Sequence, residues 1–223
     1  LMSRRCDAII LHVEAVTDEY LISLSRGTTP VYLMSRYVEE LKEHCISLDN
    51  KLGGYLATKS VLEQGHTEIA YIAGPQFKAD AANRLAGHKQ ALEEANITFD
   101  PSLYFEGDFN ETGGSSALEH LINSKLNFTA LVCANDEMAS GAMKYAREHG
   151  YHLPNDLSIV GFDNVIFANY LYPTLTTIDN PVAKMGEMAA KLVLKDVYQT
   201  KNIKINRFFE PTLMQRDSSA PLK

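Results

Sequence analysis

The chain has 223 residues, of which 45% are hydrophobic and 22% are charged, and this is the composition of an ordinary globular protein. The length suffices for one large domain or for two smaller lobes that each bury a core. The formal net charge of −7 argues against nucleic-acid binding by these residues, because phosphate contacts need a basic surface.

The cysteines and the apolar segments indicate in which cellular compartment the protein is expected. Cys6, Cys45 and Cys133 lie far apart without a C-x-x-C spacing, which indicates neither a zinc site nor a disulfide framework. No segment reaches the roughly 18 consecutive apolar residues of a membrane span. The opening "LMSRRCDAIILHVE" does not have the layout of a cleavable signal peptide. We therefore expect a cytoplasmic protein without a membrane partner.

Strand-like and helix-like segments alternate from the start of the chain. Strands are expected in "CDAIILHV", "TPVYLMS" and "CISLD", with a helix near "TDEYLISLS" after the first of them. The segment "DNKLGGYLATKSVLEQGH" predicts a helix, with Asp49 or Asn50 as its cap and Gly65 as its stop. The strand "EIAYIAG" follows. This alternation is typical of a parallel sheet with helices on its faces.

The alternation continues to the end of the chain. A helix from about Asp80 through "RLAGHKQALEEAN" precedes the strand "LYFEGDF", the helix "ETGGSSALEHLINS", the strand "TALVCAND", a helix ending at Gly150 and the strand "LSIVGFDN". The segment "FANYLYPTLTTIDNP" is expected to be irregular, and a helix, "VAKMGEMAAKLVLKDVYQ", and a last strand, "FFEPTLMQ", follow it. The opening "LMSRR" reads as the tail of a helix whose preceding strand and helix are missing.

Polar or aromatic residues follow four of the expected strands. Because parallel strands end at one edge, these residues should meet at the crevice where open α/β sheets bind ligands. Capping would explain each residue separately, and a cap is the simpler interpretation of Asn135. Asp163 with Asn164 precedes no clean amphipathic helix, so capping and ligand binding both stay open there.

The expected rim carries the chemistry of sugar recognition. Sugar hydroxyls donate to carboxylates and accept from arginine or amide groups, while apolar sugar faces stack on aromatic rings. Arg84 is expected in the first turn of its helix, where a cation interacts unfavourably with the helix macrodipole and costs about 0.3–1 kcal/mol. It should therefore have an anionic or ligand partner. A solvated Arg84 and a core Phe109 are the alternatives.

Catalytic and metal motifs are missing from the sequence. It contains no G-x-S-x-G elbow, no G-x-x-x-x-G-K phosphate loop and no H-E-x-x-H, and the seven histidines have no metal-ligand spacing. We therefore expect a protein that is not an enzyme and uses no cofactor and no metal.

Several motifs together resemble the effector-binding domain of the LacI/GalR family of transcriptional repressors, and most strongly its galactose-responsive members. They are "SLDNKLGGYLATKSVLEQGHTEIAYIAGP", "RLAGHKQALEEANI", "FTALVCANDEMASGAMKYAREHG", "LPNDLSIVGFDN" and "YPTLTTIDNP". The resemblance implies a periplasmic-binding-protein-like (type I) α/β fold of two parallel-sheet lobes with the effector between them. The first lobe would comprise residues 1–48 and 179–205, truncated at its N-terminus, and the second 49–178 and 206–223.

The resemblance also implies which residues bind the effector. Arg84 matches the arginine that holds hydroxyls, Phe109 the aromatic residue that stacks on the sugar, and Asp163 the effector-binding aspartate. Ser35 departs from the Asp or Asn usual at its position, and Asn180 is a candidate at the hinge. The full set of candidates is Ser35, Asp80, Arg84, Phe109, Asn135, Asp163 and Asn180.

The implied function is a sugar sensor in a dimeric repressor whose operator affinity falls when D-galactose closes the lobes. Operator DNA would be bound only through a helix-turn-helix headpiece, which this sequence does not contain. Apolar residues near "FANYLYP" and around Met138 to Met143 are candidates for the homodimer surface, with a core role as the alternative for the methionines. Another sugar, a purine, a transporter's sugar-binding protein and an enzyme are the remaining alternatives.

Overall fold

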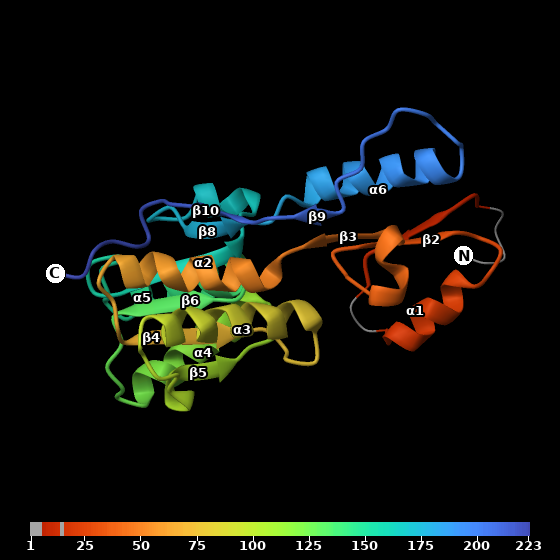
Figure 1. The fold of residues 1–223 in the computed structure, drawn as a ribbon. Coiled ribbons are helices and arrows are strands. Elements are labelled where there is room, and N and C mark those ends of the chain that lie inside the picture. The colour runs from red at the N-terminus through yellow and green to blue at the C-terminus, as the bar shows by residue number, and fades with distance from the viewer. Residues whose placement is uncertain (1–5, 14–15) are drawn as a thin grey trace. The chain divides into compact units, whose positions relative to one another are not determined.

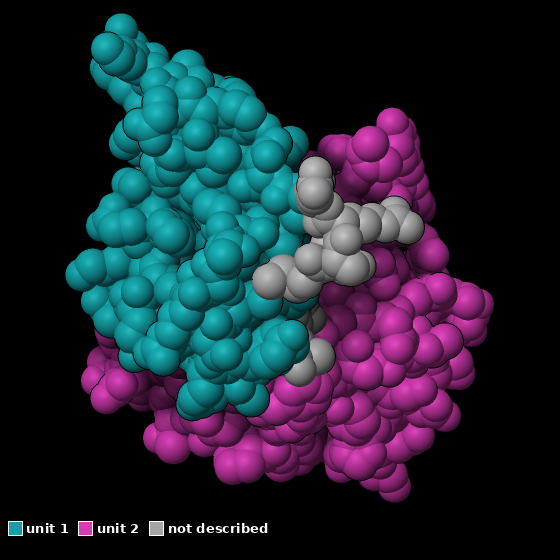
Figure 2. Space-filling view, turned by 90° about the vertical axis from the view of Figure 1, so that its right-hand side faces the viewer, with its two compact units in different colours: residues 1–49, 181–210 teal, residues 50–180, 211–223 magenta. Residues whose placement is uncertain are grey.

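The computed structural model describes residues 6–13 and 16–223, which form two compact units (Figures 1 and 2). Unit 1 comprises residues 1–49 and 181–210, and unit 2 comprises residues 50–180 and 211–223. The helix tail expected in "LMSRR" lies outside the described residues.

Unit 1 contains a parallel sheet with the strand order β1-β2-β3-β9. Its helix α1 begins after Thr17, whose hydroxyl accepts a hydrogen bond from the Tyr20 amide at 3.3 Å. Leu21 of this helix packs with Val31 and Leu33 in the core of the unit. The elements are β1 (Ile9–Leu11), α1 (Asp18–Ser25), β2 (Val31–Met34), η1 (Glu39–His44), β3 (Cys45–Leu48), α6 (Val182–Asp196) and β9 (Phe208–Phe209).

Unit 2 contains a larger sheet with the strand order β10-β8-β7-β6-β4-β5. β10 (Thr212–Met214) runs antiparallel to β8, and the five other strands pair in parallel. Those strands are β4 (Ile69–Ala73), β5 (Tyr104–Glu106), β6 (Ala130–Cys133), β7 (Ser158–Asp163) and β8 (Thr176–Asp179). The predicted α/β fold with parallel sheets is confirmed.

The helices of unit 2 pack in pairs, α2 (Asn50–Glu63) against α3 (Ala79–Glu94) and α4 (Glu111–Asn123) against α5 (Asp136–Glu148) (Figure 1). Right-handed crossovers, the rule for parallel strands, would place the two pairs on opposite faces of the sheet. The short helices η2 (Pro101–Leu103) and η3 (Ile166–Asn169) lie in connections. Gly65 and Gly150, with φ of +92° and +84°, follow α2 and α5, in the left-handed conformation that commonly ends helices.

Two expectations about strands are wrong in detail. The segment "FANYLYPTLTTIDNP", expected to be irregular, contains β8 inside the larger sheet. The expected single strand "FFEPTLMQ" is two strands, since β9 pairs with β3 in unit 1 and β10 pairs with β8 in unit 2. Pro211 between them has no amide hydrogen to continue a ladder. Residues 206–210 therefore fall in unit 1, whereas the sequence assigned them to the second lobe.

Candidate functional site

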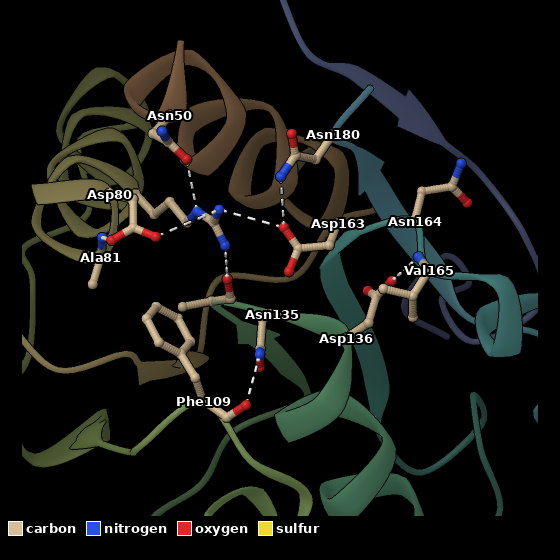
Figure 3. Close-up of polar contacts among 12 residues, drawn as sticks. Asn50, Asp80, Ala81, Phe109, Asn135, Asp136, Asp163, Asn164, Val165 and Asn180 are labelled. Atoms are coloured by element: carbon tan, nitrogen blue, oxygen red, sulfur yellow. Dashed lines mark hydrogen bonds and ion pairs between the residues drawn. The ribbon is translucent and has the colours of Figure 1, made fainter. Parts of the chain in front are cut away.

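The carboxyl ends of the parallel strands of unit 2 form one rim. The rim gathers six of the seven sequence-predicted site residues: Asp80, Arg84, Phe109, Asn135, Asp163 and Asn180 (Figure 3). Ser35 belongs to unit 1, where it follows β2 with φ of +62°. Its hydroxyl is buried and has no hydrogen-bond partner among the described residues.

Arg84, on α3, is the centre of the cluster and is only 5% exposed, which excludes the solvated alternative. Its Nη1 donates to the Ala134 carbonyl at 2.6 Å, and its Nε donates to Asn50 Oδ1 at 2.9 Å. Its Nη2 lies 3.4 Å from Asp163 Oδ1 and 3.9 Å from Asp80 Oδ2 (Figure 3). The two carboxylates compensate the buried cation. α3 begins at Ala79, so Arg84 lies in the second turn and not in the first turn that the sequence predicted; its need for an anionic partner comes from burial.

Asp163 ends β7 in a conformation that is unusual for a residue with a side chain, with φ of +108°, and Asn164 follows with φ of +50°. Asp163 Oδ1 accepts from Asn180 Nδ2 at 3.1 Å in addition to Arg84. Burial raises the pKa of Asp163, and the adjacent Arg84 opposes this rise. The side chain keeps 25% of its surface exposed, so a ligand can reach it.

Phe109 follows β5 and is half-buried, with φ of +68°. Its ring centroid lies 6.0 Å from the guanidinium carbon of Arg84 and 5.1 Å from Lys78 Nζ. A Cβ at residue 74 would lie 2.1 Å from the Phe109 ring, so only glycine there admits the ring in this position.

Asn135 has two structural roles at the rim. Its Oδ1 accepts from the Met138 amide at 3.0 Å, which caps α5, and its Nδ2 donates to the Phe109 carbonyl at 2.9 Å. The simple cap interpretation is therefore correct for the oxygen. The amide nitrogen in addition ties the connection after β5 to the start of α5.

Two residues that were not among the seven predicted site residues support the cluster. Asn50, considered only as a helix cap, accepts from Arg84 and fixes its guanidinium. Asp136, at the first position of α5, is fully buried; its carboxylate accepts from Thr177 Oγ1 at 2.5 Å and from the Val165 amide at 2.9 Å. Burial raises the pKa of Asp136 to about 7.

Arg216 holds the turn after Asp163 from its other side. Its Nη2 donates to Asn164 Oδ1 at 2.6 Å, and its Nη1 donates to the Leu175 carbonyl at 2.6 Å. Asn164 Nδ2 in turn donates to Asp179 at 2.7 Å. Since Arg216 and two residues of β8, Thr177 and Asp179, bond the Asn164 side chain and backbone, they hold the strained backbone at Asp163 and Asn164 in place.

Among residues 6–13 and 16–223, no group of three or more His, Cys, Asp or Glu side chains could hold a metal ion. Over the same part of the chain, no helix is both long enough and apolar enough to cross a membrane.

Two α/β units, one with a polar rim around a buried arginine, define a periplasmic-binding-protein-like protein. Residues 58–219 match the model of the periplasmic binding protein-like domain family. The chain belongs to this family, as an effector-binding domain of the type found in LacI-family regulators.

Relatives and solved structures support this membership. The chain is 36% identical over 218 residues to the HTH-type transcriptional regulator GalR of Salmonella typhimurium, covering 98% of this chain but 64% of that protein. It is 34% identical over 223 residues to the ribose operon repressor of Haemophilus influenzae, covering 100% of this chain and 67% of that protein. The chain thus spans just under two thirds of the length of GalR.

The fold also matches a solved structure. A sugar-binding transcriptional regulator of the LacI family from Escherichia coli, complexed with phosphate, superimposes with a TM-score of 0.92 at 28% sequence identity. The match covers 99% of this chain and 79% of that one.

Proposed function

We propose that the rim cluster of unit 2 binds the hydroxyl groups of a sugar, and that the sugar is D-galactose. The observation that carries the proposal is the contact between Arg84 and Asp163 at 3.4 Å, with part of Asp163 still exposed. A hydroxyl can donate to the carboxylate and accept from the guanidinium at the same time, so the pair is matched to a polyol. The half-buried Phe109 ring supplies an apolar surface beside it.

The proposed role is that of an effector sensor in a cytoplasmic LacI-family repressor whose operator affinity falls when the sugar binds. A ligand shifts such an equilibrium only as far as it prefers one state, typically by about 1–3 kcal/mol. The net charge of −7 agrees with DNA contact through a helix-turn-helix headpiece rather than through these residues.

The proposal is tested by thermal unfolding with D-galactose, D-glucose, D-ribose and a purine in parallel. A ligand at about a hundred times Kd adds about 2.7 kcal/mol, and about 2–4 °C per kcal/mol predicts a rise of several degrees with galactose. Asp163→Asn should abolish the rise, whereas Asp156→Asn, at an exposed carboxylate paired with His152, should keep it. A rise with every compound, or an unchanged rise in Asp163→Asn, would refute the site.

A second candidate is another sugar, and ribose in particular, because a relative at 34% identity is a ribose operon repressor. The same carboxylate and guanidinium pair would bind pentose hydroxyls. A rise in the unfolding temperature with ribose but not with galactose would favour this candidate and would leave the proposed site intact.

We also propose that the chain forms a homodimer through the connection after β7. Ile166, Tyr170 and Tyr172 are 80%, 81% and 83% exposed, which is unusual for three apolar or aromatic side chains within seven residues. Met138 and Met143, considered for the same surface, are fully buried in unit 2 and are core residues.

A further inference from the structure

A cavity of about 470 Å³ lies in unit 2 at the end of the sheet opposite to the rim. It adjoins the start of β4 and the connection between α3 and β5. Much of its surface is apolar or aromatic, and this part is formed by Ile69, His88, Leu92, Ile97, Phe99 and Leu103. Ile97 and Phe99 are only half-buried, so apolar surface is left accessible within the cavity.

His88 is the polar group of this wall that is deeply buried, at 1% exposure. Its ring stacks on Tyr71 with 4.4 Å between centroids, and Phe99 meets it edge-on at 6.1 Å. Burial lowers the pKa of His88 to about 3, so the imidazole is neutral at physiological pH. A neutral imidazole has one nitrogen that donates and one that accepts.

The Thr58 hydroxyl lies 3.0 Å from the Gly54 carbonyl and 2.8 Å from His88 Nδ1. With its proton donated to the Gly54 carbonyl, the hydroxyl accepts from Nδ1, and this tautomer leaves Nε2 as an acceptor. Within the described residues His88 is hydrogen-bonded through Nδ1 and not through Nε2, and the residue lines the cavity.

The outer wall of the cavity is held in place by its own hydrogen bonds. Asp100 Oδ1 accepts from the amide and the hydroxyl of Ser102, at 2.8 and 2.7 Å, which caps η2. The Ile97 amide donates to the Leu92 carbonyl at 2.9 Å. A preformed wall of this kind reduces the ordering cost of binding.

We propose that this cavity binds a small aromatic molecule carrying one hydrogen-bond donor, of the size of indole or phenol. The N–H or O–H donates to His88 Nε2, and the ring packs against Phe99 and Leu92. The volume is within the range of about 300–1,000 Å³ that is typical of small-molecule sites. The site is separate from the rim and does not depend on the sugar proposal.

The first test is calorimetric titration of the chain with indole, phenol and 1-methylindole, which keeps the indole ring but lacks the N–H. We expect saturable binding of indole with one site per chain, and binding of 1-methylindole at least tenfold weaker. Equal affinities for the two indoles would refute the role of His88 Nε2. Absence of saturable binding of both indole and phenol would refute the site.

Variants locate the binding within the chain. Ile97→Trp fills the cavity and should weaken indole binding at least tenfold. The matched change Ile166→Trp, at a residue that is 80% exposed and outside the cavity lining, should leave it unchanged. His88→Phe keeps a ring but removes the acceptor, and should also lose tenfold or more. Unaltered binding in Ile97→Trp would overturn the proposal. Thermal unfolding checks each variant, and if His88→Phe does not fold, the two indoles compared on the unaltered chain decide.

Discussion

The guanidinium carbon of Arg84 lies 3.7 Å from the centroid of the Phe162 ring, within the range of a cation–π contact. Together with the bonds to Ala134 and Asn50, this stacking fixes the cation without help from a ligand. Arginine suits this place because its planar group stacks and donates in several directions at once. The site is therefore preorganised, which reduces the ordering cost of binding.

Arg84→Lys should lower galactose affinity at least tenfold, although it keeps the charge. A single ammonium cannot make the contacts to Ala134, Asn50 and Asp163 together, and hydrogen bonds to charged groups contribute about 1.5–3 kcal/mol each. Titration calorimetry measures the change. Arg147→Lys is the matched control, because Arg147 is exposed and bonds the Tyr172 carbonyl away from the cluster. Equal affinities of Arg84→Lys and the unaltered chain would contradict the site.

Gly54→Ala should destabilise unit 2 by about 1–3 kcal/mol, as overpacking does. A Cβ at this position would lie 2.0 Å from the Arg84 carbonyl oxygen, so α2 and α3 would have to separate. Gly186→Ala, inside α6, is the control of opposite sign. Its Cβ would meet nothing closer than Met34 Sδ at 3.8 Å, and removing a helical glycine contributes about 0.5–1 kcal/mol. Chemical denaturation of both variants measures the difference, and a neutral Gly54→Ala would refute the close packing.

Asp136→Asn should change how stability depends on pH. The folded pKa of Asp136, about 7, is above its unfolded value of 3.8. The contribution of this group to the free energy of unfolding is therefore fully present below about pH 3.8 and is lost as the pH rises through 7. Asparagine does not titrate, and its amide can still donate to Thr177 and accept from Val165.

We expect the free energy of unfolding of Asp136→Asn, relative to that of the unaltered chain, to increase from pH 4 to 7 and to stay constant above pH 7. Denaturation at a series of pH values measures it. Asp163, whose pKa is also raised and whose charge contributes to the raised pKa of Asp136, is present in both proteins. A difference that is constant with pH would contradict the raised pKa.

Ile166→Asp should weaken self-association if the connection after β7 is the dimer surface. A carboxylate in an apolar interface is costly to desolvate. Sedimentation equilibrium measures the dimer dissociation constant, and we expect it to rise at least tenfold. Phe77→Asp, at a residue that is 78% exposed in the connection after β4, should leave it unchanged. Equal effects of both substitutions would argue against this surface.

The rim was accessible to sequence reasoning because parallel strands end together, and Asp163 and Arg84 each stood out as poorly explained by local structure. Asn50 and Asp136 were not assigned to the site because each begins a helix, where a polar residue is expected for local reasons. Their contacts, to Arg84 and to Thr177, join segments 34 and 41 residues apart. No local sequence pattern indicates such distant partners.

β8 was not predicted from the sequence because the strand begins with two polar residues, Thr176 and Thr177. Thr176 and Thr177 are fully buried, and a buried hydroxyl is normally hydrogen-bonded. The Thr177 hydroxyl is bonded to Asp136, and the Thr176 oxygen accepts from the Arg216 amide at 3.0 Å. The strand is therefore satisfied by partners distant in sequence, and neither a hydrophobic period nor an apolar run marks it.

The double hydrogen bonding of Asn135 restricts which residue types can occupy its position. An ionised aspartate could supply the oxygen that caps α5 but has no donor for the Phe109 carbonyl, and serine or threonine has a single hydroxyl oxygen in place of the separate oxygen and nitrogen of Asn135. At Thr17, which only caps α1, any of these residues would serve. Position 135 should therefore be far less tolerant of variation among related sequences than position 17.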